Sequence, residues 1–279
     1  MIWFYCSCAL LFILKTSSAA DTLLPNQILK DGDETIVSAN FELGFFTRKQ
    51  SLRYLGIMYY KKGENGTVVW VANREVPFAD PMGTLKFTDN GTLQLVDVNN
   101  TIIWSSQPSK TLANISPVAQ LLDNGNLVIK DNITGAFIWE SFDHPGNTWL
   151  PGMKLGVDLV TGIHRNLTSW TTRLDPSPGS YTVSMDVNGY PQLYITNTIG
   201  ESQQRVGSAN GLGFTGMNGL IQNNVSEHEF VYKKEEMYIM FTLLNNSSFT
   251  KMILNYEGGF RQFVWNNNNQ SWKKYNALR

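Results

Sequence analysis

The chain has 279 residues, of which 42% are hydrophobic and 16% are charged, and its formal net charge is -1. This length is sufficient for one or two domains, each able to bury a core of ordinary size. The near-neutral balance leaves no basic surface of the kind that nucleic-acid binding requires, so nucleic acid is excluded as a partner.

The N-terminus has the pattern of a secretory signal peptide. An apolar run from Ile2 to Leu14 precedes small residues that end at Ala20, where we expect cleavage. A membrane anchor needs about 20 apolar residues, and neither this run nor any later segment has them. We therefore expect a secreted or extracellular chain without a membrane span. Both cysteines, Cys6 and Cys8, lie in the signal, so no disulfide is expected in the mature chain.

Short segments with alternating apolar and polar residues dominate the remaining sequence. Examples are "GTLQLVDV", "YTVSMDV" and "GFRQFVW", each bounded by Gly, Asn, Asp or Pro. Such segments predict β-strands, and no window keeps the spacing of an amphipathic helix. The sequence therefore predicts an all-β fold.

One pattern of strand, Asn-Gly corner, strand and tryptophan occurs three times, with the first copy the most degenerate. The three copies span residues 41–75, 86–106 and 121–141. Trp70, Trp104 and Trp139 stand 34 and 35 residues apart, one in each copy. Repetition at this period indicates an architecture of stacked or radially arranged units.

The sequence divides into four parts. We expect a signal peptide at residues 1–20, a repeat-containing first module at 21–150, a connector at 151–165 and a second module at 166–279. The connector assignment rests on a segment rich in Pro and Gly that lacks a steady period, "FDHPGNTWLPGMKLGVDLVTG".

Several short sequence motifs are specific to one family. With "WVANRE", "LPGMKLG", "NLTSW" and "GSYTVSMD", the chain from near Asp21 to its C-terminus resembles the extracellular part of plant S-locus glycoproteins and S-domain (G-type lectin) receptor-like kinases. The resemblance implies a bulb-type lectin β-prism of three four-stranded sheets around a pseudo-threefold axis, followed by a second lectin-like β module, the S-locus glycoprotein domain. Each of the three tryptophans then points into the shared centre of the prism, where large aromatic area stabilises most.

The family's remaining parts are cysteine-rich EGF-like and PAN modules, a membrane helix and a kinase. This chain stops at "WKKYNALR", about where those cysteines begin in the family, so the second module is expected to be either whole or truncated. The glycine-rich nucleotide loop, the His-Arg-Asp loop and the Asp-Phe-Gly metal site of kinases are not in the sequence. We expect no enzyme here, and either a natural short secreted form or a fragment of a receptor kinase.

Mannose-binding bulb lectins carry the pattern Q-x-D-x-N-x-V-x-Y, whose alternate spacing puts five side chains on one face of a strand. In the third copy only Asn126 and Val128 match this pattern. Leu122 cannot form the hydrogen bonds of glutamine, and Asn124 replaces the charged acceptor. We expect a degenerate carbohydrate site at Asn124, Asn126 and Val128 that binds mannose weakly or not at all.

In S-locus receptors the stretch that matches residues 201–241 contacts a cysteine-rich peptide ligand. Here this stretch includes "QQRVGSANGLGFTGMNGLIQNN", which predicts long loops of the kind that bind partners. The family's aromatic Pro-Trp pair is replaced by Ser208 and Ala209. Arginine and aromatic side chains supply much of the energy of protein interfaces. The expected anchors are Arg205, Phe214, Met217 and Tyr238.

Asn-x-Ser/Thr acceptors are dense and predict a glycosylated extracellular surface. They are Asn65, Asn90, Asn99, Asn114, Asn132, Asn166, Asn224, Asn245, Asn246 and Asn269.

The sequence leaves three classes of function in order of preference. The first is a recognition ectodomain for a protein or peptide ligand, in pollen recognition or immune-type signalling, with homo- or hetero-dimerisation among receptors of the same family. The second is a soluble mannose-type lectin. The third, a β-fold glycosidase, lacks a paired-carboxylate or nucleophile signature. No cofactor or metal is expected, because the acidic run at residues 31–34 lacks further calcium ligands and the three histidines are scattered.

Overall fold

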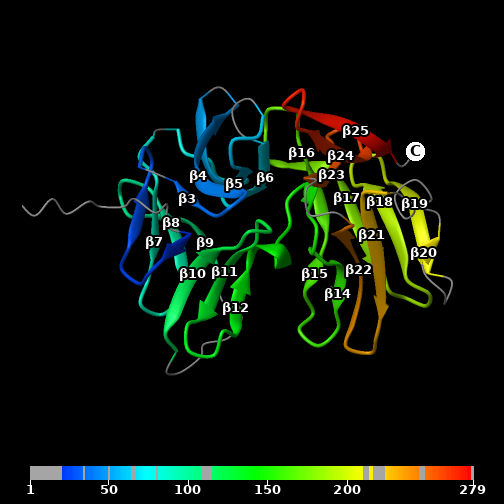
Figure 1. Cartoon of the computed structure of the whole chain (residues 1–279), viewed down its shortest axis with the longest axis horizontal. Helices are drawn as coiled ribbons and strands as arrows, with labels where there is room; N and C mark the ends of the chain where they lie inside the picture. The colour runs from blue at the N-terminus through cyan, green and yellow to red at the C-terminus, as the bar shows by residue number, and fades with distance from the viewer. Residues whose placement is uncertain are drawn as a thin grey trace, which may run out of the picture.

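The computed structural model describes residues 21–33, 35–49, 51–63, 67–79, 81–107, 115–209, 214–215, 224–244 and 249–277. These residues form strands and one short 3-10 helix, η1 (Ser141–Asp143), so the predicted all-β class is confirmed. Two β modules lie side by side, the first in blue to green and the second in green to red (Figure 1). The predicted signal peptide lies outside the described residues.

The first module consists of three antiparallel four-stranded sheets. One sheet has the order β1 (Thr22–Leu23), β10 (Pro117–Leu121), β11 (Leu127–Asp131) and β12 (Phe137–Glu140). The next has β2 (Ile28–Lys30), β7 (Thr84–Phe87), β8 (Leu93–Val96) and β9 (Ile102–Ser105). The last has β3 (Ile36–Val37), β4 (Phe41–Arg48), β5 (Leu52–Tyr59) and β6 (Thr67–Val71).

The three repeated tryptophans meet at the centre of this module, as the family resemblance implies. Trp70, Trp104 and Trp139 come from β6, β9 and β12, the last strand of each sheet. Their ring centroids are 5.7, 6.2 and 5.8 Å apart in edge-to-face pairs, the geometry that aromatic quadrupoles favour. One sheet cannot enclose a core, and the repetition in the sequence supplies the three sheets that do.

The second module also has three antiparallel sheets. One has β13 (Thr148–Trp149), β23 (Thr250–Leu254), β24 (Phe260–Asn266) and β25 (Ser271–Ala277). Another has β15 (His164–Arg165), β14 (Leu155–Asp158), β22 (Glu236–Leu243) and β21 (Ser226–Tyr232). The five-stranded sheet has β16 (Leu167–Trp170), β17 (Pro178–Asp186), β18 (Gln192–Asn197), β19 (Ser202–Ala209) and β20 (Phe214–Thr215). Trp149 is fully buried against Phe241 and Phe260 at its core.

Residues 151–165, predicted as a connector, hold β14 and β15; these strands pair with each other, and β14 also pairs with β22. The connector prediction missed these strands because β14 contains a glycine. This residue, Gly156, has a φ of 155° and pairs with Tyr238. A Cβ at this position would stand 2.1 Å from the carbonyl oxygen of Met237. A glycine that allows two strands to approach closely resembles loop composition when only the sequence is read. Among the described residues, no helix is long and apolar enough to span a membrane.

Candidate functional site

Asn126, one of the two residues that match the mannose pattern, uses its side chain inside the fold. It is 3% exposed and stands just before β11. Its Nδ2 donates to Oε2 of Glu140 at 2.8 Å. Its Oδ1 accepts from the Ser141 hydroxyl at 3.1 Å and from the Phe142 backbone N–H at 3.2 Å. The amide therefore fastens β11 to the end of β12 and to η1, and both of its ends are already hydrogen-bonded.

The other two positions of the degenerate site differ from each other in exposure. Val128 is fully buried and pairs with Glu140 on β12, whose pKa is raised by burial. Asn124 is exposed at the corner before β11, where its Oδ1 accepts from the Asn126 backbone N–H at 3.1 Å. Of the three residues, Asn124 alone is exposed to solvent.

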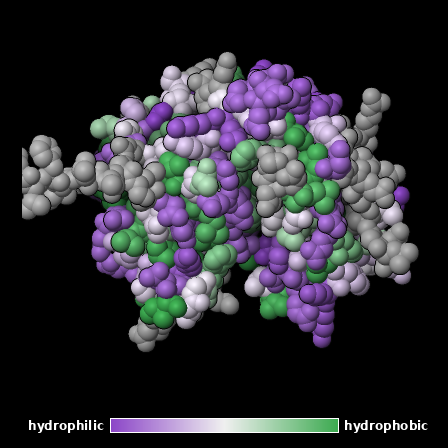
Figure 2. All heavy atoms as spheres, in the orientation of Figure 1, coloured by the Kyte–Doolittle hydropathy of each residue, from purple (hydrophilic) through white to green (hydrophobic). Residues whose placement is uncertain are grey.

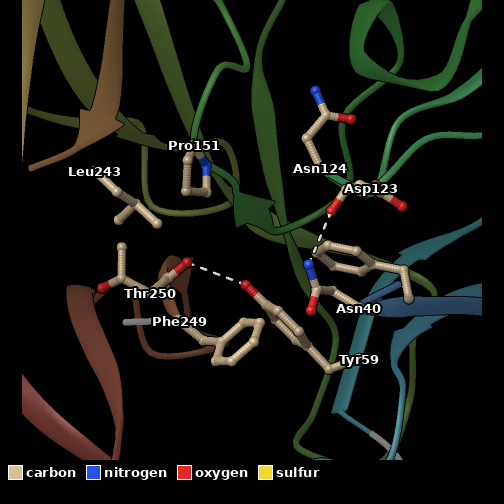
Figure 3. A pocket seen from close by; sticks show the side chains of 9 residues that line it. Asn40, Tyr59, Asp123, Asn124, Pro151, Leu243, Phe249 and Thr250 are labelled. Carbon is tan, nitrogen blue, oxygen red and sulfur yellow. Dashed lines mark hydrogen bonds between the residues drawn. The ribbon is translucent and has the colours of Figure 1, made fainter. Parts of the chain in front are cut away.

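Asn124 borders a cavity of about 360 Å³ at the joint between the modules (Figure 3). This joint pocket combines side chains of the first module with side chains of the second. Its lining residues are Asn40, Phe41, Tyr59, Asp123, Asn124, Pro151, Leu243, Phe249 and Thr250. The volume is within the range of small-molecule sites, which are mostly apolar with a few polar groups.

The polar side of the joint pocket comes from the first module. Oδ1 of Asp123 accepts from the Ala39 backbone N–H at 3.0 Å, and the Asn40 amide donates to the Asp123 carbonyl at 3.4 Å. Within the described part of the chain, Oδ2 of Asp123 and Nδ2 of Asn124 have no hydrogen-bond partner. Two residues at the rim of the pocket thus each keep one polar atom free, a carboxylate oxygen and an amide donor.

The apolar side of the joint pocket is built around Tyr59. The Tyr59 ring lies 4.5 Å from Phe41 and 6.1 Å from Phe249, measured between centroids. Its hydroxyl donates to the Thr250 carbonyl at 3.0 Å, a contact drawn in Figure 3. Burial raises the pKa of Tyr59, so this hydroxyl stays protonated and keeps donating. The residue joins β5 of the first module to β23 of the second.

Arg74, in the motif "WVANRE" of the first module, also joins the two modules through hydrogen bonds to the second. Its Nε donates to the Pro176 carbonyl at 2.8 Å. Its Nη2 donates to the carbonyls of Thr168 and Ser169 at 3.1 and 2.8 Å. Burial lowers the pKa of Arg74 to about 10, which still leaves it charged at neutral pH. The sequence showed Arg74 only as part of a family motif. It did not reveal the role of Arg74 in joining the modules, because its hydrogen-bond partners lie about a hundred positions away.

Lys251 of β23 is a buried cation at the same joint. Its ammonium stands 4.1 Å from the centroid of Trp272 and 5.8 Å from that of Tyr59. Aromatic faces attract such a cation, but they replace water only in part. Burial consequently lowers the pKa of Lys251 to about 7.

In the second module, Arg205 is exposed on β19. It pairs across the sheet with Tyr194 of β18. Oε1 of Gln192 accepts from the Tyr194 hydroxyl at 3.0 Å and from Nη1 of Arg205 at 3.5 Å. These three side chains are called the Arg205 cluster below. The sequence did not single out Gln192 or Tyr194, although their spacing of two places them on one face of a strand.

Of the other expected anchors, Tyr238 lies apart from this cluster. Tyr238 is 8% exposed on β22, in a different sheet, beneath the Lys154 ammonium at 4.4 Å. Phe214 begins the edge strand β20, which pairs with β19. The Phe214 side chain and Met217 lie outside the described residues. Across the described ranges, no three potential ligands gather into a metal site.

Comparison with known proteins identifies two domain types. The model of a D-mannose binding lectin matches residues 67–171, and that of an S-locus glycoprotein domain matches residues 204–278. The S-locus-specific glycoprotein S6 of Brassica oleracea is 37% identical over 95% of this chain and 60% of its own length. The two domain types, and the similarity over 95% of this chain, match S-locus glycoproteins and G-type lectin receptor kinases, and a chain with these two domain types is called an S-domain chain below. Neither matched domain of this S-domain chain is a kinase.

A G-type lectin S-receptor-like serine/threonine-protein kinase of Arabidopsis thaliana, RKS1, is 35% identical over 95% of the S-domain chain and 32% of its own length. The chain thus spans about three fifths of one relative and a third of the other. Among solved structures, a monomeric mannose-binding lectin from Gastrodia elata covers 44% of the S-domain chain and 96% of its own, at 18% identity and a TM-score of 0.32.

Proposed function

We propose that this S-domain chain is the extracellular part of a recognition protein and binds a protein or peptide ligand, in pollen recognition or immune-type signalling. The observation that carries the proposal is the Arg205 cluster, in which Gln192 accepts hydrogen bonds from an exposed arginine and from a half-buried tyrosine beside it. Arginine and tyrosine are the side chains that most often dominate protein interfaces. Secretion through the predicted signal peptide, and pairing with another receptor of the family, belong to the same proposal.

The relatives support this class of function. One is named as a receptor-like kinase and the other as an S-locus glycoprotein. The internal hydrogen bonds of Asn126 support it further, since they occupy an amide that a mannose site on β11 needs. Phe214 and Met217, which follow Arg205 in the chain, are proposed as neighbouring anchors of the ligand surface.

The test is capture of ligand from tissue extract by the immobilised secreted chain, with R205A compared to the wild type. R173A serves as the matched control, because Arg173 is also exposed on the second module and lies in the turn before β17. We expect R205A to lose the captured partner and R173A to retain it. The proposal fails if R205A and the wild type capture the same set of proteins.

A second candidate function is carbohydrate binding, and the joint pocket favours it. Asp123 and Asn124 border the pocket together with the apolar side chains of Phe41, Leu243 and Phe249, a combination of polar and apolar groups that suits a sugar ring with hydroxyls on one side and C–H groups on the other. The measurement is calorimetry with methyl α-mannopyranoside. If the pocket binds it, D123N weakens binding about tenfold by removing a charged acceptor.

The matched control for this substitution is D89N, at the corresponding corner of the second copy and away from the joint pocket. Binding that is equal in D123N, D89N and the wild type would refute the pocket as a sugar site. No saturable heat from any of the three would support recognition of protein alone.

A further inference from the structure

Two hairpins of the first module carry exposed apolar side chains next to a glycan acceptor. In the β8–β9 hairpin, Val98 and Ile102 are 57% and 54% exposed on either side of Asn99. In the β11–β12 hairpin, Ile133 and Phe137 are 78% and 50% exposed just after Asn132. Figure 2 shows hydrophobic side chains gathered at the lower end of this module, over the β11–β12 hairpin. Apolar side chains grouped in this way usually mark a surface that something covers.

The positions of these acceptors follow the internal repeat. Asn65, Asn99 and Asn132 are 34 and 33 residues apart, close to the spacing of 34 and 35 residues between the tryptophans. Asn99 and Asn132 stand in equivalent hairpins, each before the last strand of its sheet. Asn65 precedes β6 in the chain and lies outside the described residues. The repeat therefore places Asn99 and Asn132 at the same corner of two sheets.

In both hairpins an aspartate side chain accepts hydrogen bonds from the turn that carries the acceptor asparagine. In the first, Oδ1 of Asp97 accepts from the backbone N–H groups of Asn99 and Thr101, at 2.9 and 2.7 Å. In the second, Asp131 accepts from the backbone and hydroxyl of Thr134. An aspartate that precedes the turn and binds its backbone fixes the turn and directs the following side chains outward. The side chains of Asn99 and Asn132 are exposed and make no hydrogen bond in the described structure.

The surface beside Asn99 is hollowed as well as apolar. Asn99 borders a cavity of about 280 Å³ together with Val98, Ile103 and Met82. Met82 is itself 59% exposed. A carbohydrate attached to Nδ2 of Asn99 starts at the rim of this hollow, and the C–H faces of its sugar rings can pack on the aliphatic side chains.

We propose that Asn99 and Asn132 are glycosylated and that their glycans cover the apolar tips of these two hairpins. Transfer forms a bond between Nδ2 and the anomeric carbon of a lipid-linked oligosaccharide diphosphate, breaks the carbon–oxygen bond to the diphosphate, and releases one amide proton. The glycans take the place that a protein partner would otherwise occupy on the first module. Ligand access is then directed to the second module.

Asn166 is also a glycan acceptor but is less exposed than Asn99 and Asn132, so it serves as an internal control. It lies between β15 and β16, is half-buried, and its Oδ1 is shielded from solvent. Because Asn166 is less exposed than Asn99 and Asn132, we expect it to be modified to a smaller extent than those two acceptors. Peptide mapping of the secreted chain after enzymatic deglycosylation in heavy-oxygen water reads out each acceptor separately.

The functional test compares N99Q and N132Q with N269Q, a matched change at an acceptor in the β24–β25 turn whose neighbours are all polar. We expect N99Q and N132Q to bind a hydrophobic dye at least about twofold more than the wild type and to lose soluble monomer, because apolar area becomes uncovered. N269Q is expected to match the wild type. If a variant is poorly secreted, adding I133S to N132Q restores secretion when the exposed apolar side chain is the cause. Unmodified Asn99 and Asn132, or behaviour of N99Q and N132Q equal to that of N269Q, overturns the proposal.

Discussion

At the scale of single residues, the side chain of Asn126 illustrates what alternate spacing can and cannot predict. The spacing predicted the face on which Asn126, Val128 and Asn124 lie relative to β11. It could not predict that Glu140, Ser141 and Phe142 complete the hydrogen bonds of Asn126, because these partners come from β12 and η1 after a hairpin. Alternate spacing predicts which face of a strand a side chain lies on, whereas its hydrogen-bond partners from other elements are known only from the fold.

Replacement of Asn126 by alanine is predicted to lower the free energy of unfolding by about 2 kcal/mol or more. The loss removes the partner of the buried Phe142 N–H, which costs about 1–3 kcal/mol, and one partner of the half-buried Glu140 carboxylate. N267A is the control, since Asn267 is exposed in the β24–β25 turn. Urea unfolding of both variants measures the difference, and equal midpoints would contradict this account of Asn126.

Lys251 predicts a pH dependence whose sign can be stated. Its pKa is lowered to about 7 in the folded chain from an ordinary value of 10.5, so the unfolded chain binds more protons between these values. The free energy of unfolding should therefore rise with pH in this window, by about 1.4 kcal/mol per pH unit from this group. Below pH 7 the lysine is charged in both the folded and the unfolded chain, so the full free-energy cost of burying its charge lowers stability there.

The variant K251M isolates this group because methionine has a similar length and no charge. The difference in unfolding free energy between K251M and the wild type should be largest near pH 7 and shrink toward pH 10. Unfolding curves at three pH values measure it. A difference that does not change with pH would show that Lys251 keeps an ordinary pKa.

At the scale of elements, the repeated strands and tryptophans were predictable because local pattern and period carry them. The strands β14 and β15 were not, since β14 contains Gly156 and β15 has only two residues. The pairing of β14 with β22 bridges about 80 positions, at Leu155 with Ile239. Composition rich in Pro and Gly describes a loop and a closely packed strand equally well.

The variant G156A is predicted to destabilise the second module far more than G162A. Both glycines have positive φ, 155° and 75°, so both substitutions introduce backbone strain of more than about 1 kcal/mol. Only at Gly156 does a Cβ collide with backbone, since nothing lies within 4 Å of one at Gly162. Thermal unfolding of both variants measures the steric part. Equal losses would mean that β14 does not approach β22 as closely as described.

At the scale of the whole molecule, the joint determines which surfaces remain for recognition. Arg74, Tyr59 and Lys251 connect the two modules through hydrogen bonds and aromatic contacts. None of these contacts was visible in the sequence, because the hydrogen bond from Tyr59 to Thr250 spans 191 positions. The joint pocket and its free polar groups were equally beyond sequence patterns, although Asn124 was already a candidate.

The variant R74Q is predicted to loosen the joint without unfolding either module. The guanidinium donates to three carbonyls of the second module, and a glutamine cannot reach them all. Loss of about 1.4 kcal/mol or more corresponds to about tenfold faster hydrogen exchange in β6 and β16. R173Q is the control on an exposed loop. Exchange rates in β6 and β16 that match those of R173Q would exclude Arg74 as a fastener of the joint.

The central claim is that recognition uses the Arg205 cluster of the second module and not the degenerate sugar strand. A photo-crosslinking amino acid placed at Gln203, exposed on β19 two positions from Arg205, tests this most directly. The same amino acid at Lys130 on β11 probes the sugar strand. After irradiation in tissue extract, the account predicts a discrete protein adduct from position 203 and none from position 130. An adduct from position 130 with none from position 203 would contradict it.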